Sequence, residues 1–251
     1  MGRGDHLIAV LLLVVHGSDA AALELEGGVT HEELTNDRPD WDSVYVEGSH
    51  DFAPRQTLYG VVREVERFDL RDTELGVAYY QPFGASWTGQ FEASYSSDHN
   101  VLPETSVLGQ FAWAVGGGWV VSGGARFNEY TDTGTRLLLA GVERYFGSYR
   151  VAYTAYNGKP DGASSAPSHR LALDRYYFNE RSRIGVSVAW GSEVENVGPP
   201  TGVIVTDTRA ITVVGRHWVT PKWAFAWEVG THEQGDYYRR TGGRLGLRYS
   251  F

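Results

Sequence analysis

The chain ends in the stretch Arg244-Leu245-Gly246-Leu247-Arg248-Tyr249-Ser250-Phe251. Its odd-numbered positions carry apolar or aromatic side chains, and its even-numbered positions carry polar or small ones. Alternation of this kind places all the apolar side chains on one face of a β-strand. The stretch therefore predicts a terminal strand with one apolar face and one polar face.

The same alternation recurs in residues 87–96, 119–128, 184–190 and 223–230. A soluble β-sandwich turns such apolar faces inward, whereas a membrane β-barrel turns them to lipid and its polar faces to the lumen. Alternation alone does not separate these two folds, but aromatic-rich apolar faces favour the barrel. We therefore expect five tryptophans to face lipid: Trp87, Trp119, Trp190, Trp223 and Trp227.

Fourteen candidate strands follow from this pattern. They run near residues 22–30, 43–52, 56–66, 70–80, 86–97, 106–115, 118–130, 135–146, 148–157, 168–178, 182–192, 209–219, 221–231 and 240–251. Short connections follow the even strands, and longer ones, such as 98–105, 158–167 and 193–208, mostly follow the odd strands. Short periplasmic turns and longer outer loops are typical of outer-membrane barrels. The first strand is weak and the connection at 67–69 is short, so twelve strands is an alternative.

The N-terminus has the pattern of a secretory signal peptide. Arg3 provides a positive charge, residues 7–15 form an apolar run, and small residues follow up to Ala22. The run is too short to cross a bilayer as a helix, which needs about 20 residues. We expect cleavage after Ala22, and one barrel domain over residues 23–251; a buried N-terminal helix is the alternative.

At the other terminus, Arg244, Gly246, Tyr249 and Phe251 resemble the C-terminal signal by which the outer-membrane assembly machinery recognises its substrates. Recognition of that kind adds a strand through backbone pairing, and alternate side chains give specificity. The two termini together predict an all-β, transmembrane, antiparallel up-and-down barrel of about 12–14 strands, exported to the cell outer membrane. Its expected partners are outer-membrane lipid and the barrel assembly machinery.

Composition narrows the possible functions. The chain has no cysteine, which excludes a disulfide framework and thiol chemistry. Its formal net charge is −9, which argues against nucleic acid as a partner. The 8 Trp, 15 Tyr and 10 Phe residues suit the aromatic girdles that barrels place at the membrane interfaces.

Several segments resemble the YaiO-type family of outer-membrane β-barrels. They are LTNDRPDW at 34–41, APRQTLYG at 53–60, HNVLP at 99–103, GRHWVTP at 215–221 and HEQGD at 232–236. Their order and spacing carry the resemblance, since none is specific alone. The resemblance implies an outer-membrane barrel and supplies no activity.

Charged side chains on the polar faces are the candidate functional residues of the lumen. They are Glu92, Arg126, Arg150, Glu228, His232, Arg244 and Arg248. One interpretation is interior salt bridging that fills and stiffens the barrel, because buried charges must be paired. The other is a selective pore or an anionic-glycan site lined by arginine. We expect a mostly filled interior with a small outward-facing vestibule near His99 and His232.

The sequence identifies no catalytic, cofactor-binding or metal-binding residues. Ser168 and His169 are adjacent in sequence, so their side chains point to opposite faces of a strand. His232, Glu233 and Asp236 form a loose group that suits a hydrated loop better than a base or metal cluster. The favoured hypothesis is a non-enzymatic narrow channel, export-associated pore or structural barrel for a polar or glycan ligand. The alternative is a barrel-based hydrolase or acyltransferase acting on envelope lipid or polysaccharide.

Overall fold

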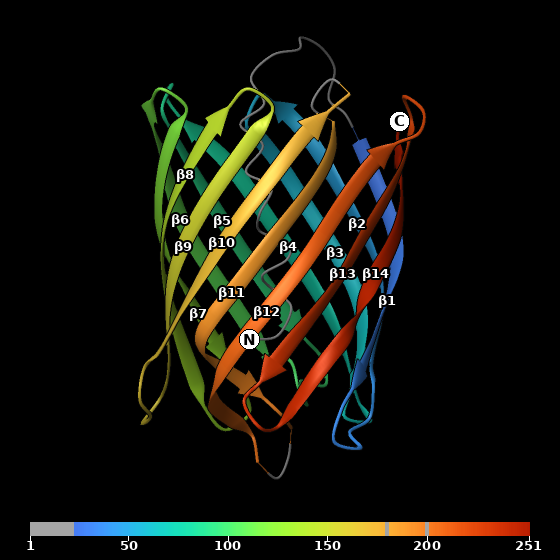
Figure 1. Ribbon diagram of the computed structural model, residues 1–251, viewed down its shortest axis with the longest axis vertical. Coiled ribbons are helices and arrows are strands. Elements are labelled where there is room, and N and C mark those ends of the chain that lie inside the picture. Colours follow the sequence, from blue (N-terminus) through green and yellow to red (C-terminus); the bar gives the residue numbers. More distant parts are fainter. Residues whose placement is uncertain (1–22, 179–180, 199–200) are drawn as a thin grey trace.

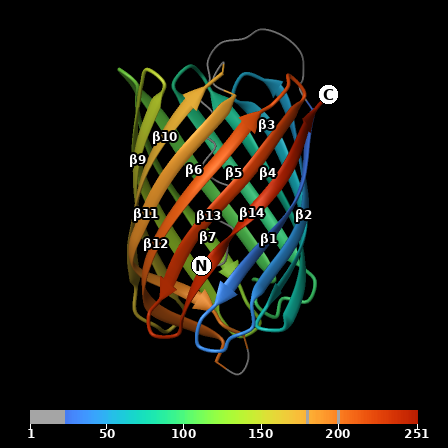
Figure 2. The ribbon, with the colours of Figure 1, turned by 45° about the vertical axis from the view of Figure 1, so that its right-hand side comes forward.

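The computed structural model describes residues 23–178, 181–198 and 201–251, which form one closed β-barrel (Figures 1 and 2). Its strands are β1 Leu23–Leu34, β2 Trp41–Ala53, β3 Gln56–Arg67, β4 Leu70–Phe83, β5 Trp87–Ser96, β6 Thr105–Gly116, β7 Trp119–Glu129, β8 Gly134–Phe146, β9 Tyr149–Pro160, β10 Ala166–Tyr177, β11 Ser182–Asn196, β12 Val203–Trp218, β13 Trp223–Gln234 and β14 Tyr238–Ser250. No helix in this part of the chain is long and apolar enough to cross a membrane. The expected signal peptide, residues 1–22, lies outside the described residues.

Closure of the barrel depends on the first strand, which pairs on both sides. Glu26 of β1 lies opposite Glu47 of β2 and opposite Arg248 of β14, and all the pairings are antiparallel. Closure leaves no open sheet edge, which a membrane-spanning sheet requires. Fourteen strands is therefore confirmed over twelve, and β1 extends four residues beyond the segment expected from its weak pattern.

The two faces of the wall have opposite chemistry. Outward side chains are apolar and remain accessible at the protein surface, as for Leu75 at 62% and Val29 at 56% exposed. Inward side chains are polar and buried, as for Glu26 at 3% and Gln90 at 2%. This is the reverse of a soluble core and is the arrangement that places the outer wall in lipid.

The tryptophans expected to face lipid lie on the outer face. Trp87, Trp119, Trp190 and Trp223 are exposed. Trp227 is only half-exposed because its ring packs on Gly215, its register partner on β12. A Cβ at Gly215 would lie 2.2 Å from that ring, so only glycine admits the contact.

Turns at the end of the barrel that carries the C-terminus are short, namely residues 54–55, 84–86, 117–118, 147–148, 178–181 and 219–222. Connections at the opposite end run from two residues, at 68–69, to eight, at 97–104. In barrels of this type the end with the short turns and the termini faces the periplasm. The other end is then the outer mouth.

The prediction of a long outer loop over residues 193–208 is wrong. β11 continues to Asn196 and β12 begins at Val203, with Asn196 opposite Val203 in register. The expected loop at 158–167 likewise shrinks to residues 161–165. Backbone pairing extends the strands because every buried N–H and C=O needs a partner. We refer to residues 191–208 as the mouth hairpin.

Candidate functional site in the barrel lumen

The mouth hairpin crosses the outer mouth instead of rising from it. In a ring of fourteen strands, β11 and β4 are seven strands apart and belong to opposite walls. A Cβ at Gly198 of the hairpin would nevertheless lie 2.8 Å from the Cδ1 atom of Leu70 on β4. The Asn196 side chain also donates a hydrogen bond of 3.3 Å to the Val101 carbonyl, in the loop between β5 and β6. The hairpin therefore spans the barrel.

Apolar side chains seal the hairpin against the far wall. One buried cluster contains Trp41, Val197 and Tyr238, with Leu34, Phe68 and Ile204 packed against it. A second contains Val65, Val101 and Leu102, with Phe68 and Leu70 packed against it. Phe68 joins the two clusters, so the mouth is closed by a layer of the kind that forms soluble protein cores.

An ion pair lies buried within this closure. Arg67 of β3 and Glu195 of the mouth hairpin are 2% and 3% exposed, and the Arg67 Nη1 and Glu195 Oε1 atoms are 3.8 Å apart. The guanidinium of Arg67 lies 4.4 Å from the ring centre of Trp41, and that of Arg240 lies 4.9 Å from it. Nη1 of Arg67 makes no hydrogen bond with any described residue. A buried donor without a partner costs about 1–3 kcal/mol, so this contact across the mouth is weaker than its burial suggests.

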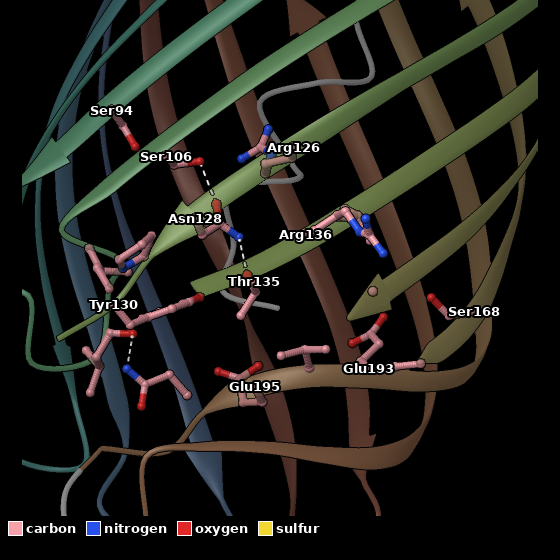
Figure 3. Close-up of a pocket in the computed structure, with 18 of the residues that line it drawn as sticks. Ser94, Ser106, Arg126, Asn128, Tyr130, Thr135, Arg136, Ser168, Glu193 and Glu195 are labelled. Atoms are coloured by element: carbon pink, nitrogen blue, oxygen red, sulfur yellow. Dashed lines mark hydrogen bonds between the residues drawn. The ribbon is translucent and has the colours of Figure 1, made fainter. Parts of the chain in front are cut away.

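A cavity of about 60 Å³ lies on the inner side of the mouth hairpin (Figure 3). Arg126, Asn128 and Thr135 line one side, and Glu193 and Glu195 of the hairpin line the other. Further polar lining comes from Ser94, Ser106 and Ser168. Ser106 donates to Asn128 at 2.7 Å, and Asn128 donates to Thr135 at 3.1 Å. The space holds a few water molecules or one small polar group.

Towards the periplasmic end, a five-residue charge cluster joins β14, β1 and β2. Arg248 contacts Glu47 at 2.6 Å, Glu26 at 2.7 Å and Glu24 at 3.1 Å. Arg244 contacts Glu26 at 2.7 Å and Glu47 at 3.3 Å. Because the two arginines share Glu26 and Glu47, the five side chains form a network rather than a set of isolated pairs.

Other ion pairs line the remaining wall. Arg150 of β9 contacts Glu143 of β8 and Asp174 of β10, each at 2.7 Å. Arg126 of β7 contacts Glu92 of β5 at 2.6 Å, reaching past β6. Arg63 pairs with Glu74 between β3 and β4. The charges therefore interlock mainly along the wall, between neighbouring strands.

The candidate residues from the sequence all lie on the inner face. Glu92, Arg126, Arg150, Arg244 and Arg248 belong to the ion pairs above. Glu228 lies directly opposite Arg244 in register. His232 contacts Thr208 at 2.8 Å and Gln234 at 2.9 Å. Neither His99 nor His232 lines the cavity, and the mouth hairpin occupies the place expected for an outward-facing vestibule.

The loose group of His232, Glu233 and Asp236 does not converge. Glu233 pairs with Arg239 on the exposed outer face at 2.7 Å, whereas His232 faces the lumen. Ser168 lines the cavity, while His169 contacts the Tyr153 hydroxyl at 2.8 Å on the opposite face of the strand. Among the described residues no three His, Cys, Asp or Glu side chains form a metal-binding group.

Thr208, His232 and Glu193 are the nearest approach to a hydrolytic triad in the described residues. Thr208 Oγ1 lies 2.8 Å from His232 Nε2, and a Glu193 oxygen lies 3.6 Å from the same nitrogen. A catalytic acid must bind the other ring nitrogen to orient the histidine as a base. This geometry gives no support to the hydrolase alternative.

Sequence reasoning missed the acids that complete the network, chiefly Glu26, Glu47, Glu143 and Asp174. Each lies on the inward parity of its strand, so the same alternation would have found them. Their pairing with particular arginines depends on strand register and could not be predicted from the sequence. Glu193 and Glu195 were assigned to an outer loop and are the most informative omission.

A closed barrel with an apolar outer wall and a charged lumen defines a membrane β-barrel of the outer-membrane type. The sequence matches the YaiO membrane beta barrel domain over residues 24–196, and the chain belongs to this family.

Several solved structures are similar to this chain at low sequence identity. OpdO of Pseudomonas aeruginosa is 10% identical, with a TM-score of 0.51 over 92% of this chain and 96% of that chain. The anion-selective porin from Comamonas acidovorans is 10% identical, with a TM-score of 0.49 over 92% of this chain and 99% of that chain. OmpT of Vibrio cholerae is 11% identical, with a TM-score of 0.49 over 94% of this chain and 99% of that chain. No curated protein matches the sequence.

Proposed function

We propose that this protein is a narrow outer-membrane channel for polar solutes, closed at rest by the mouth hairpin. One observation carries the proposal: Glu195 of β11 reaches Arg67 of β3 inside the barrel. A hairpin that only lengthened the wall would not meet the opposite side. The contact leaves Nη1 of Arg67 without a hydrogen-bond partner among the described residues, so this ion pair adds little to the apolar seal. Release of the hairpin would open the outer mouth.

The chemistry of the lumen supports a polar cargo. On the inner faces of the adjoining strands β1–β5, eight acids outnumber Arg63 and Arg67 of β3, and they are Glu24, Glu26, Glu32, Glu47, Asp51, Asp72, Glu74 and Glu92. The inner faces of β10–β12 below the mouth hairpin carry Arg170, Arg183 and Arg216 against the single acid Asp174. Many of the eight acids are paired with arginines of nearby strands, and a lumen lined by charged and polar side chains admits polar solutes and excludes apolar ones.

A purely structural barrel is the second candidate. The network of Arg244 and Arg248 with three glutamates favours it, because interlocked side chains stiffen a wall without forming a path. Conductance distinguishes the two functions.

We further propose that the last strand is the assembly signal, carried by Arg244, Gly246, Tyr249 and Phe251. In the closed barrel Tyr249 packs edge-to-face on Phe251 with ring centres 4.8 Å apart, and edge-to-face on Trp223 at 4.7 Å. β14 pairs with β1 only when the barrel closes. Before closure its edge is therefore free for strand addition. Delivery to the outer membrane through a cleaved signal peptide over residues 1–22 belongs to the same proposal.

Planar-bilayer recordings of the refolded full chain test the channel. The first variant is Glu195→Gln, which leaves Arg67 buried without its acid. The second replaces residues 194–205 by a two-residue Asn-Gly turn, since Glu193 and Thr206 are register partners able to flank it. The matched control is Glu64→Gln, which breaks an exposed ion pair with Arg71 at the same rim.

We expect the wild type and the control to remain closed almost all the time. We expect Glu195→Gln to open in bursts and the shortened variant to conduct steadily. A shortened variant that folds, as judged by its mobility on unheated gels, and yet never conducts would show that the channel proposal is wrong and the barrel is structural.

A further inference from the structure

Two arginines face each other on the inner wall near the periplasmic end. Arg183 of β11 and Arg216 of β12 are direct register partners, and both side chains lie on the inner parity of their strands. Like charges directly opposite each other destabilise a pair of strands unless an opposite charge lies nearby. The arrangement therefore needs a compensating anion.

The acids of the protein do not provide full compensation. The closest ion-pair contact of Arg183 is Asp174 at 3.8 Å, and Asp174 already binds Arg150 at 2.7 Å. Arg216 donates from Nε to the Arg181 carbonyl at 3.2 Å, and forms no ion pair with any acid in the described residues. Arg244 and Arg248, by contrast, each bind at least two carboxylates. The shortage of close ion-pair contacts is thus local to Arg183 and Arg216.

An independent observation at the same place concerns Trp218, two residues beyond Arg216 on the same face of β12. Its indole Nε1 is buried and has no hydrogen-bond partner in the described part of the chain. The guanidinium of Arg181 lies 3.6 Å from the Trp218 ring centre and is held by the Pro221 carbonyl at 3.0 Å and by Glu24 at 3.3 Å. This N–H, two residues along the same strand face from Arg216, adds a buried donor that lacks an acceptor among the described residues.

The strands next to these donors, β13 and β14, carry small residues at the register positions facing them. Arg216 lies opposite Ala226 on β13, and Ala226 lies opposite Gly246 on β14. Trp218 lies opposite Ala224. Small side chains therefore flank the donors on the side towards β13 and β14.

We propose that Arg183, Arg216 and the Trp218 N–H form an oxyanion-binding site at the periplasmic mouth, which takes the carboxylate or phosphate group of a solute. Planar guanidiniums match both groups in geometry and bind them bidentately. The proposal deepens the channel function, on which it rests for its role in transport, by specifying that the cargo is anionic. Binding itself does not require the channel to open.

Calorimetric titration of the folded full chain in detergent micelles tests the site. Sodium phosphate and sodium glucuronate are the two probes, at ionic strength low enough to limit screening, about 0.02 M. The key variant is Arg216→Gln, and Arg216→Lys keeps the charge without the planar fork. The matched control is Arg144→Gln, which removes an outward arginine that packs on Trp119 near the same end of the barrel.

We expect saturable binding to the wild type and to the control, and an affinity at least tenfold lower in Arg216→Gln, about 1.4 kcal/mol. Arg216→Lys should retain part of the affinity, and Trp218→Phe should lower it about threefold, since one hydrogen bond is lost. Preference for one probe identifies the group recognised. Each variant is first checked for heat-dependent gel mobility, which reports a folded barrel.

Absence of saturable binding to the wild type, or equal binding to Arg216→Gln, would overturn the site. The outcome is separable from that of the channel proposal. Binding without conductance in the shortened-hairpin variant leaves the site in place and refutes transport. Conductance without anion binding refutes the site alone. If both proposals are correct, the shortened-hairpin variant should conduct chloride in preference to potassium in a salt gradient. Adding Arg216→Gln to that variant should reduce the preference for chloride.

Discussion

The charge network at the β14–β1 closure offers a stringent test of how the lumen is stabilised. Arg248→Gln removes one guanidinium that binds three carboxylates at 2.6, 2.7 and 3.1 Å. Glu26 and Glu47 are 3% and 5% exposed, so water does not readily replace the lost partner. The substitution leaves Glu26 and Glu47 in contact with Arg244, and Glu24 in contact with Arg181.

The expected loss follows from this geometry. Removing one member of a buried ion pair costs about 3–5 kcal/mol, chiefly because the remaining charge is buried and uncompensated. Arg244 still lies 2.7 Å from Glu26 and 3.3 Å from Glu47, so we expect the lower end, about 3 kcal/mol. The exposed pair of Arg239 and Glu233 should contribute only about 0–1 kcal/mol.

Unfolding in urea, followed by tryptophan fluorescence and by the heat-dependent gel shift, measures both values after refolding into micelles. Arg239→Gln is the matched control. Adding Glu26→Gln to Arg248→Gln should restore part of the stability, with a coupling of about 1 kcal/mol or more, because the double variant no longer buries that uncompensated charge. Equal unfolding free energies for Arg248→Gln and Arg239→Gln would refute the network as a stabilising element.

Three further outcomes test the wall and the last strand. Val229→Arg, on the outer face near the middle of β13, should destabilise the barrel by about 2–4 kcal/mol. Trp223→Arg, at the periplasmic end of the same strand, should cost only about 0–1 kcal/mol. Equal losses of unfolding free energy in urea titrations would contradict this assignment of membrane depth. Tyr249→Asp or deletion of Phe251 should lower the outer-membrane level in cells while refolding into micelles persists, and unchanged cellular levels would remove the last strand as the assembly signal. The folded chain should run faster on a gel unheated than boiled, and identical mobility would contradict a closed barrel in detergent.

The local alternation of apolar and polar residues was sufficient to predict the strands. All fourteen segments predicted from alternation form strands, because a strand's two faces follow from a period of two residues and need no distant partner. Inward charges such as Arg126 and Arg248 were identifiable for the same reason. The predicted strand ends were less accurate. Strands β1 and β12 run several residues past their predicted limits, because pairing with a neighbour extends a strand beyond its own alternating pattern.

The mouth hairpin shows where local pattern failed. Residues 193–208 contain Gly198 and Gly202 and were taken as a loop, yet Glu193 and Thr206 pair in register. The proposed anion site could not be predicted from the sequence either. Arg183 and Arg216 are 33 residues apart, and the like-charge contact appears only when β11 and β12 are set in register.

The sequence by itself determined the class of protein, a membrane barrel with a lipid-facing wall and a polar interior, because those properties depend on side-chain order along each strand. Only the tertiary structure decided that the barrel closes at fourteen strands, that Arg67 meets Glu195 across the mouth, and which charges are paired. Those features depend on closure and register, which bring together residues more than a hundred positions apart. Register is fixed by the summed pairing of whole strands, so no single segment of the chain encodes it.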